Sequence, residues 1–536
     1  MRSSDHKQLR NTSNYFRMKK IIVSAIILTT ALSCSKSFLD REPIDRKVEE
    51  TFYKTPQDAL EGLVAAYDEL QYGDYDNIQL VSEIASDDCF GGGSETDIAW
   101  KRWDRFENDN NTNLNNWTKY YTGIYRANIL LSKLEGVNWG SDAALKTRYE
   151  AEARFLRAYF YFDLVRMFGN VPLVTTPLVP GEYNVPQAKP EDVYKLIAGD
   201  LRFAADNLAN TPYNAIPSGD YGRVTKWAAE ALLGRVFLYY TGYYGQADIP
   251  GVVTKQDVRT YIDDVINTSG YGLVDSFPRL WQASLSRFVG EDNKETVFAI
   301  KFTWKGLGNW DKHDGNRMQV MIGFRDGAVG PYYMGWGAGP VNPKLWEAYE
   351  VGDTRRAGSI ISVTAENLSY NKVYPQKTNF MWKKYMPMVA MKAEDHNGNF
   401  QIDNFYDYVA IRFADVLLMG AELNLDGDLG KAQRYYDMVR DRAFLDQTHR
   451  RTLAAGAAGK KLIMDERRYE LALEGHRYWD LLRQGIPVAQ QAISDNNPDP
   501  QFKVNFRPET KGLFQIPQQE LNLSNGTLKQ NDGWNQ

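Results

Sequence analysis

Two segments rich in tryptophan, tyrosine and glycine carry the residues best suited to bind a ligand. The first, residues 97–103, follows the glycines at 91–93, and the second runs from 304 to 337. Flat aromatic rings stack on the flat C–H faces of sugars, while planar polar groups bond two hydroxyls at once. The pattern therefore predicts a ligand-binding surface that could accept a sugar, built from two segments. Its candidate aromatic residues are Trp336, Trp100, Trp103, Tyr333, Trp304 and Trp310.

Two polar residues near the first segment are candidates to bond sugar hydroxyls. Asp88 precedes the glycines and Arg102 follows Trp100. Glycines on both sides of Trp336 should expose that ring. Each aromatic residue also has the alternative of packing in the core, where large rings bury much apolar area. The sequence leaves open which rings share one face.

Cys34 follows a pattern that predicts its covalent modification. Lys19 and Lys20 precede an apolar run at 21–30, and Ala31-Leu32-Ser33 leads into the cysteine. This is the layout of a secretory signal peptide, and the apolar run is shorter than the ~20 residues that span a bilayer as a helix. Leu32-Ser33-Cys34 resembles the lipobox of bacterial lipoproteins, whose cysteine is acylated at its thiol. The polar residues 1–17 fit poorly ahead of a signal peptide, which makes Met18 an alternative start.

Other motifs that could carry chemistry are incomplete. Residues 395–406 resemble the start of a calcium loop, but Phe400 and Tyr406 stand where an EF-hand requires glycine and glutamate. Residues 456–461 lack phosphate-loop spacing, and the histidines are scattered without a zinc-protease or nucleophile-elbow pattern. These motifs give no support to a metal site, a cofactor or a catalytic residue.

Composition narrows the class of partner. The 63 Lys and Arg residues are balanced by 68 Asp and Glu residues, for a net charge of −5, and they form no basic stripe. Nucleic-acid binding depends on clustered positive charge, so a nucleic-acid partner is not expected. Cys34 and Cys89 are the two cysteines, so acylation of Cys34 would leave the mature chain without an internal disulfide.

Hydrophobic periodicity predicts a helical protein whose middle portion is rich in loops. From 242 to about 407, Gly, Pro, Trp and Tyr dominate and helical periodicity fades, although 295–300 reads as a strand. We expect this loop-rich portion to hold the ligand, since binding residues are often found on loops. The predicted helices are 56–70, 117–134, 151–168, 190–208, 225–240, 409–424, 431–444 and 461–483.

Three long blocks resemble the SusD/RagB family, lipid-anchored outer-membrane nutrient-binding proteins of Bacteroidetes. They are residues 151–173, 411–424 and 465–483. The likeness spans essentially the whole mature chain, because shorter pieces occur in the family's order. These pieces are 38–40 with Pro43, 222–226, 353–356, 516–517 and 530–531.

Charged residues inside these apolar blocks predict a buried ionic network. Buried charges are tolerated when they are paired and hydrogen-bonded. Glu474 with Arg477, and Asp480 with Arg483, have the spacing of pairs along one helix face. We interpret the set as a structural network between helices and not as a catalytic site. The residues are Arg154, Arg157, Arg412, Asp415, Glu466, Arg467, Glu474, Arg477 and Asp480.

The resemblance implies a mostly α, SusD-like fold. TPR-like helix pairs would form the scaffold, at about 50–241 and 408–485, and the loop-rich portion at 242–407 would carry the ligand site. A signal peptide at 1–33 and a lipidated tether at 34–49 would precede a single domain at 50–536.

The resemblance also implies a role without a cofactor and without catalysis. The chain would face outward from the outer membrane, capture an oligosaccharide and pass it to a SusC-type TonB-dependent transporter. In starch-binding members, aromatic residues from two such loops form an arc, and Trp100 and Trp336 lie at roughly corresponding places. Two alternatives stay open: a peptide ligand in the same architecture, as for RagB-like members, or a surface glycosidase with two opposed carboxylates.

Overall fold

The computed structural model describes residues 52–73, 75–107, 109, 111–495 and 504–534. The chain divides into two compact units, residues 1–54 and 55–536. In the first unit, residues 52–54 are described and form bends. The predicted signal peptide, Cys34 and the tether at 34–49 lie outside the described residues. In the described part of the chain, no helix has the length and apolar character needed to cross a membrane.

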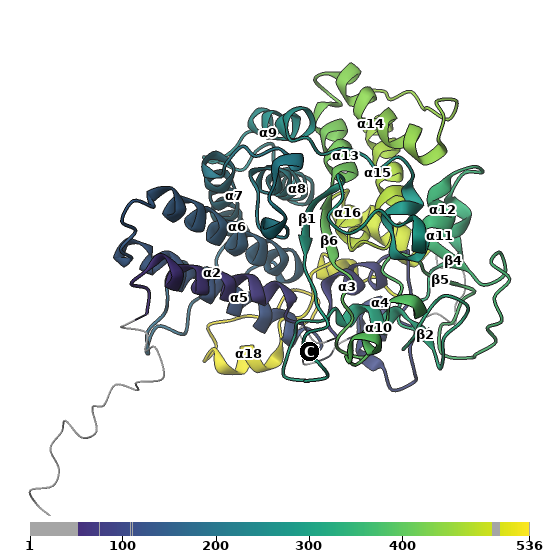
Figure 1. Ribbon diagram of the computed structural model, residues 1–536, viewed down its shortest axis with the longest axis horizontal. Helices are drawn as coiled ribbons and strands as arrows, with labels where there is room; N and C mark the ends of the chain where they lie inside the picture. The colour runs from purple at the N-terminus through teal and green to yellow at the C-terminus, as the bar shows by residue number, and fades with distance from the viewer. Residues whose placement is uncertain (1–51, 74, 108, 110, 496–503, 535–536) are drawn as a thin grey trace, which may run out of the picture. The chain divides into compact units, whose positions relative to one another are not determined.

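Helices dominate the first half of the second unit. α2 packs on α5, and each later helix of the series packs on the next, through α6, α7, α8 and α9 (Figure 1). α9 then packs on α13, which joins this series to the C-terminal helices. The helices of the first half are α2 (Pro56–Gln71), α3 (Ile78–Ile84), α4 (Ile98–Arg105), α5 (Leu114–Lys133), α6 (Ala143–Phe168), α7 (Pro190–Asn207), α8 (Lys226–Tyr244) and α9 (Lys255–Thr268).

Short elements and loops follow, before helices return. β1 and β6 pair antiparallel, with Thr296 opposite Arg412 and Ile300 opposite Tyr408, which confirms the strand predicted at 295–300. β2 and β3 form a parallel pair, and β4 and β5 an antiparallel one. The strands are β1 (Thr296–Ile300), β2 (Phe324–Arg325), β3 (Met334–Gly335), β4 (Ile360–Ser362), β5 (Phe380–Trp382) and β6 (Tyr408–Arg412). The helices are α10 (Arg317–Ile322), α11 (Pro343–Ala348), α12 (Thr354–Ser359), α13 (Phe413–Asn424), α14 (Leu429–Phe444), α15 (Ala457–Leu471), α16 (Arg477–Leu482), α17 (Ile486–Gln490) and α18 (Gln518–Leu523).

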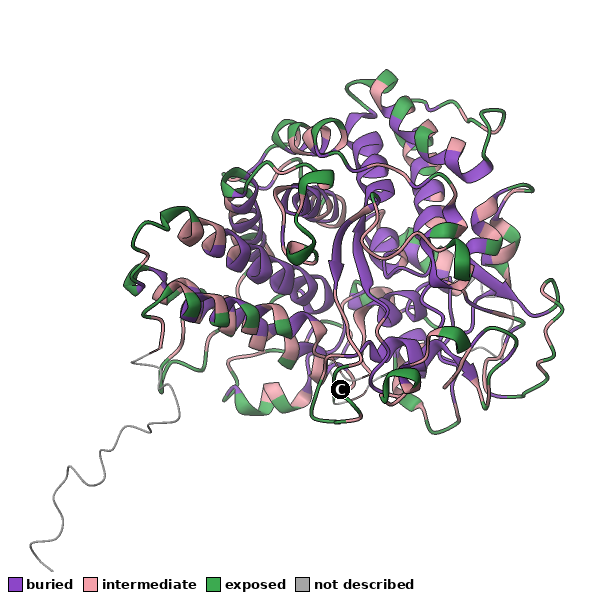
Figure 2. Ribbon diagram, viewed as in Figure 1, coloured by how far each residue is buried: buried purple, intermediate pink, exposed green. Residues whose placement is uncertain are grey.

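α6, α8 and α13 lie at the centre of the scaffold, and their amino-acid sequences explain that position. All twelve residues of α13 are buried, as is every residue of α6 from Phe155 to Phe168. Figure 2 shows this buried stretch running through the helical scaffold. Helices that are apolar on all sides belong in the interior. Gly169 ends α6 with φ +69, and a Cβ there would lie 2.7 Å from the Leu513 side chain, so glycine is required at this turn.

Two predictions about where helices occur were wrong. α9 lies inside the portion expected to be irregular, where Thr254 and Asp257 form a capping box and Val258, Ile262 and Val265 are buried on one face. The helix predicted at 461–483 is divided into α15 and α16. The helix breaks near Gly475, which has φ +84, and a Cβ there would lie 2.9 Å from the Gln79 backbone of α3.

The strand β6 is a third difference, since its residues were expected to begin a helix at 409. Residues 408–412 are instead extended and pair with β1 before α13 begins at Phe413. Every residue of β6 is buried, which suits a short apolar strand between packed helices. A short apolar run of this kind cannot be assigned to helix or strand from periodicity alone.

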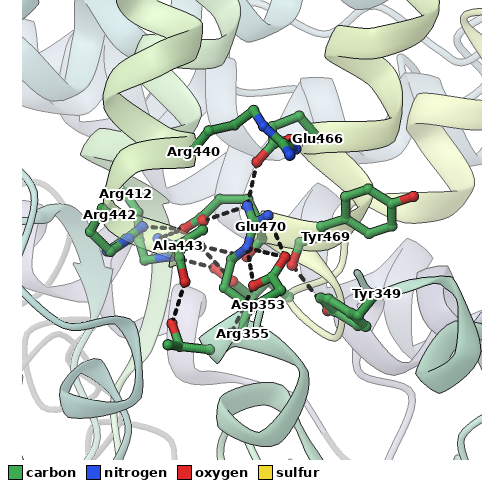
Figure 3. A network of polar contacts seen from close by, with 12 residues as sticks. Tyr349, Asp353, Arg355, Arg412, Arg440, Arg442, Ala443, Glu466, Tyr469 and Glu470 are labelled. Carbon is green, nitrogen blue, oxygen red and sulfur yellow. Dashed lines mark hydrogen bonds and ion pairs between the residues drawn. The ribbon is translucent and has the colours of Figure 1, made fainter. Parts of the chain in front are cut away.

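A buried ionic network connects α12, α14, α15 and the β1–β6 pair (Figure 3). Arg355 bonds Asp353 at 2.7 Å and Glu466 at 2.6 Å. Arg412 bonds Glu474 at 2.7 Å, and also reaches Glu295 and Glu470. Although burial alone would raise it, Arg412 and Lys384 hold the pKa of Glu474 below its ordinary value. The predicted structural network is therefore confirmed.

One of the two pairings predicted within that network was wrong. Asp480 and Arg483 do pair, at 2.7 Å. Glu474 does not pair with Arg477, because the chain turns between α15 and α16 and separates them onto different elements. Arg477 bonds Asp87 at 2.7 Å instead.

Candidate functional site

The two loops predicted to carry the ligand lie against each other. The Gly93 N–H donates to the Gly337 carbonyl at 3.1 Å, and the Gly339 N–H donates to the Gly91 carbonyl at 3.1 Å. Gly92 also pairs with Ala338 in an isolated antiparallel bridge. Gly92 and Gly93 have positive φ, and a Cβ at Gly92 would lie 2.3 Å from the Pro340 side chain, which explains these two glycines. The hydrogen bonds bring α4 and the segment that contains Trp336 to one place.

Trp100 and Trp336 form a stacked pair at this junction. Their ring centroids lie 6.2 Å apart with 20° between the planes. Trp100 is 5% exposed, and its ring also packs on Gly93, where a Cβ would lie 2.6 Å from Trp100 Cζ3. Trp336 is half-buried. The structure thus brings the two leading candidates together, with Trp100 behind the more accessible ring of Trp336.

A third ring joins the pair, and sequence reasoning missed it. The Tyr75 ring lies 4.5 Å from that of Trp336 at 57°, and Tyr75 is half-buried. It comes from the loop between α2 and α3, where tyrosines at 72 and 75 alternate with Gly73 and acidic residues. That aromatic, glycine-containing loop was the signal available in the sequence. We define the aromatic cluster as Tyr75, Trp100 and Trp336.

Two arginines lie beside the aromatic cluster. Arg325 donates to the Trp336 carbonyl at 3.1 Å, and its guanidinium lies 3.9 Å from the Asp97 carboxylate of the first loop. The Arg317 guanidinium lies 5.7 Å from the centre of the Tyr75 ring. Both were missed, because an arginine in a glycine-rich segment has no distinguishing spacing. The planar donors of Arg325, which is half-buried, suit recognition of hydroxyls and carbonyls. Arg317 is buried and donates to the carbonyls of Trp310 and Lys312, so it supports the cluster from within.

The structure places three other candidates away from the aromatic cluster. Trp103 is 1% exposed and donates to the Asn113 amide at 3.2 Å, so it belongs to the core. Asp88 is fully buried and accepts from Arg468 at 2.6 Å, and burial raises the pKa of Asp88. Arg102 pairs with Asp109. Asp88 and Trp103 therefore carry the fold, because no ligand reaches an enclosed side chain.

The remaining aromatic candidates lie around the neighbouring loop at 394–405. Trp304 stacks on His396, with ring centroids 4.2 Å apart and 23° between the planes. The Tyr333 hydroxyl donates to Glu394 at 2.6 Å, and burial together with this hydrogen bond raises the pKa of Tyr333 to about 12. Trp310 is 51% exposed. Tyr333 precedes Trp336 by three residues, so this second group borders the segment that carries the cluster.

The chemistry of the aromatic cluster is that of binding by contact. Its rings offer apolar faces, while the Asp97 carboxylate and the Arg325 guanidinium lie beside it. Asp97 also accepts from the Ser94 N–H at 2.5 Å. In the described ranges, His, Cys, Asp and Glu side chains form no group of three or more that could hold a metal ion.

A second groove is the main rival location for a ligand. It lies between α5 and α18 and encloses about 490 Å³. Tyr121, Tyr125 and Tyr183 line it together with Glu520, and Tyr183 is 65% exposed. Grooves of a few hundred Å³ lined by aromatic residues are common ligand sites. The groove lies on elements separate from both predicted loops, so substitutions can distinguish the two locations.

Comparison with known proteins gives matches over most of the chain. Residues 37–238 match a family model described as "Starch-binding associating with outer membrane", and residues 358–534 match the model of the SusD family. A SusD-like protein of Bacteroides ovatus is 28% identical, with 87% of this chain and 82% of that protein covered.

Solved structures agree with these matches. A structure named as a laminarin binding SusD-like protein is 32% identical and superposes with a TM-score of 0.76, covering 90% of this chain and 100% of its own. Surface glycan-binding protein A from Bacteroides fluxus is 25% identical, with a TM-score of 0.76 and coverage of 90% and 100%. The mostly α fold expected from the sequence is therefore confirmed.

Proposed function

This chain belongs to the SusD family, and from that premise we propose that it captures an oligosaccharide at the cell surface and delivers it to a SusC-type TonB-dependent outer-membrane transporter. The observation that carries the proposal is the stacked pair of Trp100 and Trp336. A helix and a loop from distant parts of the sequence, α4 and the segment with Trp336, meet to form it. The named functions of two relatives, laminarin binding and surface glycan binding, support a glycan as the ligand.

The geometry of the aromatic cluster suits a sugar ring. Trp336 offers a half-buried indole, and Trp100 behind it keeps that indole from collapsing into the core. A sugar lays its C–H face on such a ring and directs its hydroxyls to the rim, where polar side chains accept and donate. Asp97 and Arg325 are placed at that rim, and Tyr75 extends the apolar surface.

The class of ligand is tested by direct titration. Laminarin oligosaccharides are the first probe, followed by other β- and α-linked glucans, and by a peptide library. We expect a glycan to bind and to perturb tryptophan fluorescence. Binding of peptides alone would replace the glycan with the peptide alternative, which the same aromatic surface could also serve.

We further propose that the protein acts by binding alone, without a cofactor. The carboxylates of Asp97, which precedes α4, and of the buried Asp104 on α4 accept hydrogen bonds from the N–H groups of Ser94 and Gly91. Glycosidases instead need two carboxyl groups opposed across the sugar. Prolonged incubation with a bound glycan should leave its chain length unchanged by chromatography. Shortened products that disappear on substitution of one Asp or Glu would establish the glycosidase alternative.

The anchor and the transporter complete the proposal. Acylation of Cys34 would hold the protein at the outer membrane, and more than one acyl chain is needed for stable attachment. A Cys34→Ser chain should lose its label from radioactive palmitate and leave the membrane fraction. The native chain should co-purify with an outer-membrane transporter after mild cross-linking. Retention of Cys34→Ser in the membrane fraction would argue against the anchor.

A further inference from the structure

We propose that Asp104 and Gln376 are positioning residues that hold the glycine loop at 91–93 in the place that keeps Trp100 stacked on Trp336. The inference rests on the proposed function, because it assigns a control on ligand affinity to residues that do not touch the ligand. Asp104 and Gln376 are not members of the aromatic cluster.

Asp104 connects the glycine loop to α4. Its Oδ2 accepts from the Gly91 N–H at 3.0 Å and from Gln376 Nε2 at 2.7 Å. Asp104 lies one helical turn after Trp100, so one helix carries both the ring and the carboxylate that fixes the loop beneath it. The side chain is fully buried. Hydrogen bonds to a charged acceptor are roughly twice as strong as neutral ones, which makes this an effective anchor.

Gln376 extends the anchor to a third segment of the chain. Its Oε1 accepts from the Gly92 N–H at 3.0 Å, while its Nε2 donates to Asp104. The side-chain amide therefore bonds both the loop and the carboxylate that holds the loop. The Gln376 backbone has φ +56, a left-handed conformation that costs a residue other than glycine energy. Such conformations persist where the surrounding structure requires them, often beside functional sites.

The consequence for the ligand site follows through Gly93. Gly91 and Gly92 are fixed by Asp104 and Gln376, and Gly93 is bonded to Gly337 of the segment that carries Trp336. The same Gly93 backbone lies against the Trp100 ring. If the anchor is lost, the loop can move away, and Trp100 then loses the surface that holds it parallel to Trp336.

The ionisation of Asp104 supports this role. Burial raises the pKa of Asp104 to about 7. Its Oδ1 has no hydrogen-bond partner in the described residues, so a proton can settle there and leave Oδ2 as a weaker, neutral acceptor. Arg105 opposes this shift, whereas Glu107 favours it, and Lys101 of the same helix also interacts with the carboxylate. The anchor should therefore weaken as pH falls through 7.

The experiment compares the full chain with the Asp104→Asn, Gln376→Met and Glu230→Gln variants. Glu230 on α8 is the matched control, because it is a buried carboxylate with one oxygen that has no hydrogen-bond partner among the described residues, and burial raises its pKa to about 8. The readouts are affinity for a laminarin oligosaccharide and the circular-dichroism couplet of the stacked indoles. That couplet is assigned by its loss in a Trp336→Phe variant.

We expect both anchor variants to bind about tenfold more weakly. Asp104→Asn replaces a charged acceptor by a neutral one, and Gln376→Met removes both hydrogen bonds of that side chain. Both should show a reduced couplet, and Asp104→Asn should lose the pH dependence of the wild-type couplet near 7. A buried acid with a raised pKa costs folding free energy when ionised, so Asp104→Asn should unfold no more readily than wild type at pH 8. Glu230→Gln should retain both the affinity and the couplet.

Two results would overturn the inference. One is a wild-type couplet and wild-type affinity in both anchor variants. The other is an equal loss in Glu230→Gln, which would indicate a general effect on the fold. If the wild-type chain binds no glycan at all, the proposed function fails, but the couplet measured without ligand still decides the positioning role.

Discussion

The indole of Trp336 lies nearly parallel to that of Trp100, with 6.2 Å between the ring centroids and 20° between the planes. Trp100 lies on α4 and Trp336 on a loop far away in the sequence, and backbone bonds between glycines join that loop to the glycine loop before α4. Trp100 supplies the buried support and Trp336 the accessible face. The proposed function depends on this relationship, and the predictions below test its parts.

Gly93 should be intolerant of a side chain for a reason specific to the site. In Gly93→Ala the new Cβ would meet the Trp100 ring at 2.6 Å, on a backbone with φ +69. We expect glycan affinity to fall about fivefold, since a lost aromatic contact is worth roughly 1 kcal/mol. Isothermal titration measures this.

The matched control for that substitution is Gly140→Ala. Gly140 has φ +53 and open space around the position of a Cβ. Both variants should therefore lose about 1 kcal/mol of stability from the left-handed backbone. Equal glycan affinity in the two variants would show that contact with Trp100 is unimportant.

Arg412 should be among the residues whose loss most destabilises the fold. It bonds the buried carboxylates of Glu474, Glu295 and Glu470 at 2.6 to 2.9 Å. Arg412→Met would remove one cation from this network, in which Lys384 still pairs with Glu474 and Arg442 still pairs with Glu295 and Glu470. We expect a loss of about 3 kcal/mol in the free energy of unfolding. Urea denaturation measures it. Arg450→Met, which breaks an exposed pair with Asp441, should leave the urea midpoint nearly unchanged.

Asp480 should contribute to stability against acid. Burial alone would raise its pKa, but Arg467 and Arg483 lower it to about 2. A carboxylate with a lowered pKa in the folded state stabilises it above the unfolded value near 4, and this contribution is lost as pH falls through the folded value. The expected size is about 2 kcal/mol.

The free energy of unfolding of an Asp480→Asn variant, measured as a function of pH, checks the direction of this contribution. Its deficit in unfolding free energy relative to wild type should be largest near pH 6 and should shrink between pH 4 and 2. A deficit that stays constant over this range would mean that the ion pairs with Asp480 do not account for the difference.

Much of the helical scaffold was predictable because local signals agree with the packing. Thr55 and Asp58 form the capping box at the start of α2, and Pro190 opens α7 as expected. α9 was missed because only Val258, Ile262 and Val265 of its residues are buried. The break at Gly475 depends on the close approach of Gln79, which is distant in sequence and leaves no local pattern.

The residues that form the site were easier to predict from the sequence than their arrangement in space. Trp336 stood out because glycines flank it, and both Trp100 and Trp336 lie at places that roughly correspond to aromatic residues of starch-binding family members. Their stacking depends on hydrogen bonds between the glycine loop before α4 and the segment with Trp336. Trp103 shared the same segment as Trp100, but the helical phase of α4 turns it into the core. Tyr75 lies in a third loop, and only the folded chain shows that it meets Trp336.

The most direct test of the central claim is titration of laminarin oligosaccharides into the wild-type, Trp336→Ala and Tyr183→Ala proteins. Tyr183→Ala removes an exposed ring from the rival groove between α5 and α18, so it controls for loss of any accessible aromatic residue. We predict that Trp336→Ala reduces affinity by at least about tenfold, the equivalent of 1.4 kcal/mol, while Tyr183→Ala binds as wild type does. Wild-type affinity in Trp336→Ala, with binding lost in Tyr183→Ala, would contradict the account and move the ligand site to the other groove.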